Sequence, residues 1–505
     1  MNAAIGKVKA HFANWRGWEL NPVVVKELRQ AVRSWAVTGV LLLFLTVLFI
    51  SSIIFLVNQS LDESVDEQLG GSMFEMFVTI LAVASILFIP LYTGIRVALE
   101  RQESNPDLLY VSTLTPGQII RGKFLCGAYV AVLFFSACLP FMAFTNLLRG
   151  VDLPSVFFIL FVLFLAVCAL NQLAIFLACL PLSKPLKILL GLYCFFQSFS
   201  IIIYLVVAAF AMMHSGVGTM MAERNFWIKT ATVVGVGLAV VGLLYFLSVA
   251  LISPPSANRA LPLRLYITVI WMLGAVLSLA WVWQAHDVRP MLAWIWPTFI
   301  LMLLAILVSI SNSDQLSRRV GRRIPQSRIG RIPAFIFFNG AAGGLVWVAL
   351  LLALTYLIAK GVLVLSKTWF PPVPVPVDES KHWFVATSAY AFAYALTALF
   401  IHRKFLPKRA PKVAGVLAVL LAGVWAVAPS VVLFFLNQLS WKSVEGLQLG
   451  NIFNVFYLRA DEHRYFHTIF ALSWLAVMAA LNARWFWTQV KHFRPSPSEQ
   501  PPILT

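Results

Sequence analysis

Apolar residues run along this chain in near-continuous stretches of about twenty, and short polar segments separate the stretches. A helix of about 20 apolar residues spans the hydrocarbon core of a bilayer and satisfies its own backbone hydrogen bonds there. The pattern therefore predicts an all-α integral membrane protein with about twelve transmembrane helices. We place these spans at about 36–57, 73–95, 124–148, 156–180, 188–213, 229–252, 265–284, 291–310, 335–359, 383–401, 413–436 and 468–488.

The composition excludes a soluble protein. The 505 residues are 60% hydrophobic and 11% charged, which leaves too few polar side chains to cover a soluble surface. About 35 residues, many of them charged, precede the first span, so we expect no secretory signal peptide.

Lysine and arginine are unevenly distributed along the chain. With the amino terminus placed inside, most of the 38 basic residues fall in inward segments, and most of the 20 acidic residues fall outside. The positive-inside rule then predicts that both termini are cytoplasmic. This topology and anionic lipid account for the net charge of +18, so no nucleic-acid partner is needed. We expect a multi-pass protein of the cell membrane, specifically a bacterial cytoplasmic membrane.

The segment NPVVVKELRQAVRSW, just before the first span, predicts an amphipathic elbow helix. Asn21 can cap this helix, and Pro22 suits its first position because a missing N–H costs nothing there. Apolar residues then fall largely on one face and basic residues on the other, as in a helix lying among lipid headgroups. The alternative is a basic flank that obeys the positive-inside rule. The residues assigned to the elbow helix are Asn21, Pro22, Lys26, Glu27, Leu28, Arg29 and Arg33.

The stretch TPGQIIRGKF contains G-x-x-x-x-G-K, which is close to the phosphate-binding P-loop pattern. A P-loop needs a Ser or Thr after the lysine to bind magnesium, and Phe124 stands there instead. The stretch also runs directly into an apolar span rather than into a soluble helix. We therefore expect no nucleotide site and no enzymatic activity in this chain, and we interpret Lys123 as a flanking charge at the water boundary.

The inward segment 96–123 carries two helix starts. Ser104 or Asn105 before Pro106 caps a short helix, and Thr115 before Pro116 caps a second helix that continues into the membrane. Bulky apolar groups on the cytoplasmic side usually mark the docking surface of a partner. The alternative is that these groups fold back onto the membrane surface. They are Leu108, Leu109, Tyr110 and Leu114.

The elbow, two spans, and Glu100 leading to DLLYVSTLTPGQIIRGKFL together resemble the permease subunit of ATP-binding-cassette (ABC) transporters of the type-2 exporter class, over residues 20–255. The resemblance implies that the inward loop forms a coupling helix docked on a separate ATPase subunit. ATP and magnesium would then bind to that partner, and this chain would hold no cofactor. The coupling residues implied are Glu100, Asp107, Leu108, Leu109, Tyr110, Thr113, Leu114, Thr115, Pro116, Gly117, Gly122 and Lys123.

The second half of the chain contains six further spans but no second NPxxxKELR elbow. We divide the chain into a cytoplasmic segment with the elbow (1–35), a permease-like unit (36–255), a second six-span unit (256–490) and a short cytoplasmic tail (491–505). The loop SNSDQLSRRVGRRIPQSRIGRIPAF is a diverged repeat of the coupling loop, an anionic-lipid patch or a docking site for an acidic partner. A homodimer through the first six spans and an internal pseudo-dimer both fit the resemblance.

Two other constellations suggest different chemistry. Carboxylates in the first outward loop (Asp62, Glu63, Asp66 and Glu67) also occur in multi-span glycosyltransferases that use lipid-linked sugars, although an acidic outward turn is the simpler interpretation. A membrane scaffold without transport is a third possibility. His463 and His467 lie four residues apart beside two acids and are weak candidates for a metal site; an interfacial polar cluster is the alternative, and we expect no metal.

Lys360 stands near the outer end of a long apolar run, where it can snorkel, and several polar residues of the spans are uncharged. We interpret the uncharged ones as hydrogen-bonding groups between helices. They are Asn146, Asn171, Gln172, Gln197 and Asn339.

Overall fold

The structure is a computed structural model that describes residues 22–61, 69–103, 115–148, 151–214, 220–254, 256–369, 377–436, 448–456 and 461–495. The described residues are helical or lie in turns and connections, and they contain no strand. Within these described ranges, twelve helices are long and apolar enough to cross a membrane. The prediction of an all-helical, multi-pass membrane protein with twelve spans is thus confirmed, whereas the side of the membrane on which the termini lie stays a prediction.

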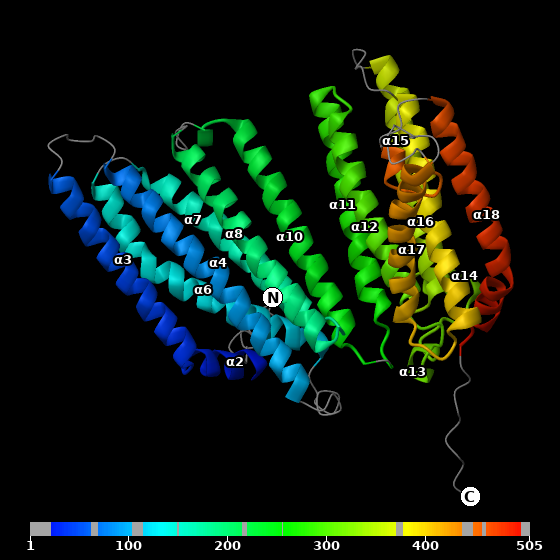
Figure 1. The fold of residues 1–505 in the computed structure, drawn as a ribbon, viewed down its shortest axis with the longest axis horizontal. Helices are drawn as coiled ribbons and strands as arrows, with labels where there is room; N and C mark the ends of the chain where they lie inside the picture. The colour runs from blue at the N-terminus through cyan, green and yellow to red at the C-terminus, as the bar shows by residue number, and fades with distance from the viewer. Residues whose placement is uncertain are drawn as a thin grey trace, which may run out of the picture. The chain divides into compact units, whose positions relative to one another are not determined.

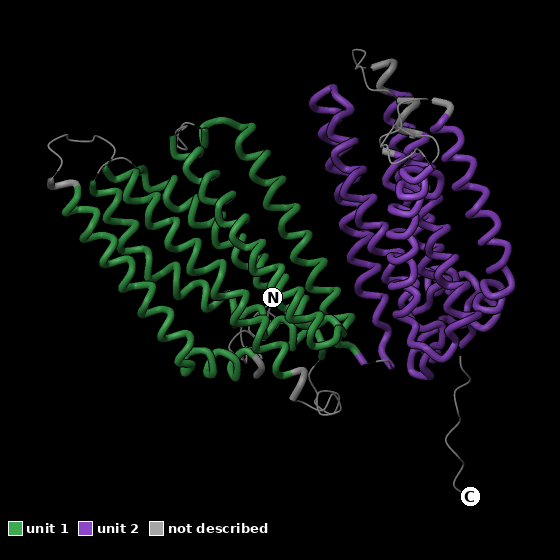
Figure 2. Tube along the Cα trace, in the orientation of Figure 1, with its two compact units in different colours: residues 1–253 green, residues 254–505 purple. Residues whose placement is uncertain are grey.

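The chain forms two compact units, Met1–Ser253 and Pro254–Thr505 (Figures 1 and 2). The division falls two residues before the predicted one, at the proline-containing linker. Unit 1 contains α2 (Pro22–Val32), α3 (Trp35–Leu61), α4 (Leu69–Glu103), α6 (Pro116–Leu147), α7 (Leu153–Cys179), α8 (Lys184–His214) and α10 (Arg224–Ile252).

Unit 2 ends in a helix that continues to His492, past the predicted start of the tail. Its elements are α11 (Ala260–Ala285), α12 (Arg289–Ile310), α13 (Arg318–Gly321), α14 (Arg328–Phe337), α15 (Ala341–Trp369), α16 (Val377–Phe405), α17 (Lys412–Leu436), η2 (Asn454–Phe456) and α18 (Asp461–His492).

The spans pair in a similar way within each unit. If the spans of a unit are numbered one to six, span two packs on spans one, three, four and five, and span four packs on spans three, five and six. A short amphipathic helix also packs on spans one and three of each unit, but it comes from different places in the chain. It is α2, before the first span, in unit 1, and α14, between the second and third spans, in unit 2. The shared pairing is consistent with a diverged repeat.

The core of unit 1 is formed mainly by large apolar side chains, many of them from α4, α6 and α7, and these three helices pack on one another. Asn171 of α7 accepts a hydrogen bond from the Thr93 hydroxyl of α4 at 2.6 Å and donates to the Phe124 carbonyl of α6 at 3.3 Å. Gly127 of α6 lies so near that a Cβ there would come within 2.4 Å of Asn171. The interpretation of Asn171 as a group bonded between helices is therefore confirmed.

Candidate functional site

The candidate site lies at the end of unit 1 where α4 ends, α6 begins and α2 packs against α6 (Figure 1). The predicted helix start at Thr115 is confirmed, with Pro116 in the first turn. The Thr115 hydroxyl accepts a hydrogen bond from the backbone N–H of Gln118, and the Gln118 side chain accepts one from the backbone N–H of Thr115. This reciprocal capping box fixes the point at which the chain enters the span.

Four charged side chains from three helices meet just inside this end, and we call them the ion-pair cluster. They are Glu27 of α2, Arg96 and Glu100 of α4, and Lys123 of α6. The Lys123 ammonium lies 3.1 Å from a Glu27 carboxylate oxygen and also pairs with Glu100. The Arg96 guanidinium lies 3.9 Å from Glu27. The cluster thus joins α2 to both helices that flank residues 104–114.

The two central members of the ion-pair cluster are removed from water. The side chains of Lys123 and Glu27 are 10% and 6% exposed, whereas that of Glu100 is 35% exposed. A buried charge is tolerated only when partners compensate it, and the two cations and two carboxylates balance. This differs from the expectation for Lys123. Its ammonium reaches across to α2 and α4 instead of lying at the water boundary, because two carboxylates lie within its reach.

Arg96 extends the cluster towards the surface. It donates one hydrogen bond to the Tyr92 hydroxyl at 2.9 Å and another to the side chain of Gln30 on α2. Neither Arg96 nor Tyr92 was identified from the sequence. A signal was present, because Arg96 and Glu100 stand four residues apart and so share one face of the helix.

Helix α2 is present where it is expected, but its buried face differs from the prediction. Val24, Glu27 and Ala31 are buried, whereas Val25 and Val32 are exposed. The contact with Lys123 places the carboxylate of Glu27 on the packed face, so the helix does not simply turn its apolar side inward. The basic residues Lys26, Arg29 and Arg33 are exposed and Leu28 is partly buried, as the elbow pattern anticipates. A position among lipid headgroups stays a prediction.

Gly117 and Gly122 lie within the first turns of α6. The Tyr245 hydroxyl of α10 donates to the Gly117 carbonyl at 3.2 Å, and a Cβ on Gly117 would come within 3.0 Å of that hydroxyl. Gly122 is buried. The stretch with the P-loop-like spacing is thus regular helix from Pro116 onward, and a helix uses its interior backbone N–H groups internally rather than wrapping them around a phosphate.

The remaining coupling and elbow residues fall outside the described part of the chain. They are Asn21, Asp107, Leu108, Leu109, Tyr110, Thr113 and Leu114. The acidic loop residues Asp62, Glu63, Asp66 and Glu67 also lie outside it.

No family model, curated protein or solved structure matches this chain. The relation to permease subunits is therefore a hypothesis based on the motifs in residues 20–255.

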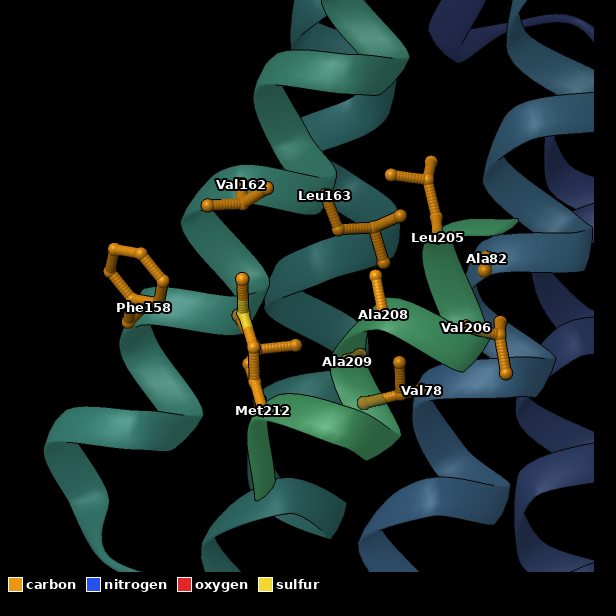
Figure 3. Close-up of a pocket in the computed structure, with 11 residues that line it drawn as sticks. Val78, Ala82, Phe158, Val162, Leu163, Leu205, Val206, Ala208, Ala209 and Met212 are labelled. Atoms are coloured by element: carbon orange, nitrogen blue, oxygen red, sulfur yellow. The ribbon is translucent and has the colours of Figure 1, made fainter. Parts of the chain in front are cut away.

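Unit 1 also contains an apolar hollow between α4, α7 and α8 (Figure 3). It encloses about 440 Å³, its open mouth included, and all 11 lining residues are apolar. Figure 3 shows Phe158 and Met212 towards one end of the hollow and Leu205 and Ala82 towards the other. Its lining offers no group for acid–base or nucleophilic chemistry, so the hollow suits only an apolar occupant.

The two histidines considered for metal binding lie on α18. His467 is fully buried, its Nδ1 lies 3.2 Å from the Tyr390 hydroxyl, and its Nε2 has no protein partner among the described residues. Over the described part of the chain, no group of three or more His, Cys, Asp or Glu side chains is arranged to hold a metal. The pair thus lacks the further protein ligands that a structural metal site would need.

Proposed function

We propose that this chain is the permease subunit of an ATP-driven ABC transporter, working as an exporter and coupled to a separate ATPase subunit through the cytoplasmic segment 96–123. The ion-pair cluster is the observation that carries this proposal. It joins the helices on both sides of residues 104–114 to α2 through charges that are expensive to separate in a low-dielectric environment.

The proposed mechanism is mechanical. The ATPase subunit binds residues 104–114 and moves them when it closes on ATP. Because Lys123 and Glu100 pair directly across α6 and α4, the two helices move together with α2 rather than separating. The ATPase must bind the two permease conformations with different affinity, since a partner that binds both equally shifts nothing.

The chain's own residues supply the rigidity that such coupling needs. Asn171 holds α4, α6 and α7 together by hydrogen bonds, and Gly127 allows α6 and α7 to approach closely. The Tyr245 hydroxyl holds the start of α6 against α10. A displacement at the loop therefore reaches five helices, α2, α4, α6, α7 and α10, through direct contacts.

The test is co-purification of ATPase activity. The tagged chain is extracted from its own membranes, and ATP hydrolysis in the captured complex is measured for wild type, Leu109→Asp and Leu109→Met. A carboxylate at position 109 removes the apolar contact, so we expect loss of the captured activity with Leu109→Asp. We expect retention with Leu109→Met, which keeps the apolar bulk.

A second arm tests transmission rather than docking. Glu27→Gln, in which Lys123 keeps Glu100 as its partner, should leave the ATPase captured while lowering ATP hydrolysis that depends on transport, since residue 27 lies on α2 and outside the coupling segment. Equal ATPase capture by wild type and Leu109→Asp, or no ATP hydrolysis in any captured complex, would contradict the proposal.

A further inference from the structure

Residues 311–340 of unit 2 join α12 to α15 and contain six arginines. Their six arginines accompany a single carboxylate, Asp314. That carboxylate accepts hydrogen bonds from the Trp485 indole at 2.9 Å and from the Ala341 backbone N–H at 3.2 Å. It is therefore engaged by α18 and α15. The arginines are Arg318, Arg319, Arg322, Arg323, Arg328 and Arg331.

The orientation of α14 in this segment is fixed from within unit 2. The buried guanidinium of Arg264, on α11, donates to the carbonyls of Ile336 and Phe338 at 2.7 Å each and to that of Gly340 at 2.9 Å. Ala334 of α14 is buried in a small cluster with Phe493, and the ring of Phe335 packs edge-on against Phe493, with centroids 5.4 Å apart. The side of α14 that carries Ala334 is thus packed against unit 2.

The exposed face of α14, turned away from Ala334, combines apolar and basic side chains. Ile329 and Ile332 are 85% and 65% exposed, and their spacing of three places them on the same face of the helix. Arg328 is exposed beside them, and four further arginines are exposed on and around α13. Arg331 instead donates to the Pro325 and Gln326 carbonyls, which closes the turn before α14.

This face lies at the boundary of the membrane-spanning region. Helix α14 packs on the first turns of α11 and α15, and the Asn339 side chain accepts a hydrogen bond from the backbone N–H of Ala260 where α11 starts. In the next turn of α11, Leu265 is exposed, as a lipid-facing residue would be. Beside the start of a membrane-spanning helix, apolar side chains favour the acyl boundary and basic side chains favour the phosphate groups.

We propose that α13 and α14 bind anionic phospholipid of the surrounding bilayer, with Ile329 and Ile332 inserted at the headgroup boundary and the exposed arginines on the phosphates. Basic side chains beside a fixed apolar pair are what an interfacial helix uses. An acidic protein would complement the charge of the arginines. It would also have to contact Ile329 and Ile332, which lie where lipid is expected to surround the helices. The proposal does not depend on the ATPase coupling of unit 1.

The first test measures lipid retained by the purified full chain. Native mass spectrometry compares phosphatidylglycerol with phosphatidylcholine for wild type and for the combined variant Arg318→Gln, Arg319→Gln, Arg322→Gln and Arg323→Gln. The matched control is Lys404→Gln, Lys408→Gln, Arg409→Gln and Lys412→Gln, which removes four exposed charges from the connection between α16 and α17. We expect the arginine variant to lose about tenfold or more in affinity for phosphatidylglycerol, and the control to lose much less.

Equal retention by the arginine variant and wild type, or an equal loss in the control, would overturn the proposal. The combined variant Ile329→Ser and Ile332→Ser should weaken binding of both lipids, because the apolar contribution does not depend on headgroup charge. The second test places p-benzoylphenylalanine at position 332 and irradiates native membranes. A phospholipid adduct supports the assignment, whereas a protein-sized adduct or no adduct refutes it.

Discussion

Removing the ammonium of Lys123 should destabilise unit 1 strongly, and the loss should depend on Glu27. In Lys123→Met the Glu27 carboxylate, 6% exposed, keeps Arg96 at 3.9 Å as its charged partner among the described residues. Leaving a buried charge without its closest partner costs about 3–5 kcal/mol of unfolding free energy. Glu27→Gln should cost less, about 1–3 kcal/mol, because Lys123 keeps Glu100.

The double variant Lys123→Met with Glu27→Gln distinguishes the effect of losing the ion pair from the effect of losing side-chain packing. With both charges gone, Arg96 and Glu100 still balance each other, so the double variant should be more stable than the sum of the single losses predicts. We expect a coupling free energy of about 2 kcal/mol or more between residues 27 and 123. Coupling between residues 100 and 123 should be about 1 kcal/mol or less, because water screens the more exposed Glu100.

Thiol alkylation provides a measurement specific to unit 1. All five cysteines of the chain lie in unit 1, and Cys138 on α6 is fully buried. Its labelling rate during titration from mild detergent into sodium dodecyl sulfate therefore reports the opening of this unit alone. The assignment of Glu27 and Lys123 as the buried pair would be refuted if their losses of unfolding free energy were additive. It would also be refuted if Lys123 were coupled more strongly to Glu100 than to Glu27.

Three further predictions concern other contacts. Gly127→Ala should cost about 1–3 kcal/mol of unfolding free energy, because its Cβ would come within 2.4 Å of Asn171. Gly235→Ala, whose Cβ would have nothing within 4 Å, should be neutral or slightly stabilising in the same alkylation assay. Arg264→Met should cost about 3 kcal/mol or more by leaving three carbonyls without their donor, and Arg264→Lys should recover part of that loss in thermal unfolding. Burial raises the pKa of the Asp314 carboxyl, against the opposing hydrogen bond from Trp485, so Asp314→Asn should alter how stability depends on pH.

The sign of the pH effect follows from that raised pKa. A carboxyl that binds its proton more tightly when folded stabilises the fold below its ordinary pKa, and this contribution is lost as pH rises through the raised value. The stability of wild type relative to Asp314→Asn should therefore fall as the pH rises above the ordinary carboxyl pKa of about 4. A difference that stays constant as the pH rises would contradict the burial of the charge. Equal losses in the two glycine variants would contradict the close α6–α7 contact, and an unchanged Arg264→Met would contradict the carbonyl contacts.

The sequence by itself determined the number of spans and the helix start at Thr115, because hydrophobic length and capping are local properties of the chain. The resemblance to permease subunits also led us to predict that Glu100 and Lys123 belong to one coupling segment that follows the elbow. It did not show that Glu27, Arg96, Glu100 and Lys123 meet, because residues on separate helices come together only through packing. The same holds for Lys123, whose burial depends on carboxylates 23 and 96 positions away along the chain.

Tertiary structure also decided which side chains of the arginine-rich loop are exposed. Its charge is visible in the sequence, but the exposure of Ile329 and Ile332 depends on how α14 is packed, with Ala334 buried and Arg264 bonded to three carbonyls at and just after the end of the helix. Periodicity specifies which residues share a face of a helix, whereas long-range contacts select the face that is buried. For this reason the spans could be predicted from local pattern, whereas the ion-pair cluster and the exposed face of α14 became visible only in the folded chain.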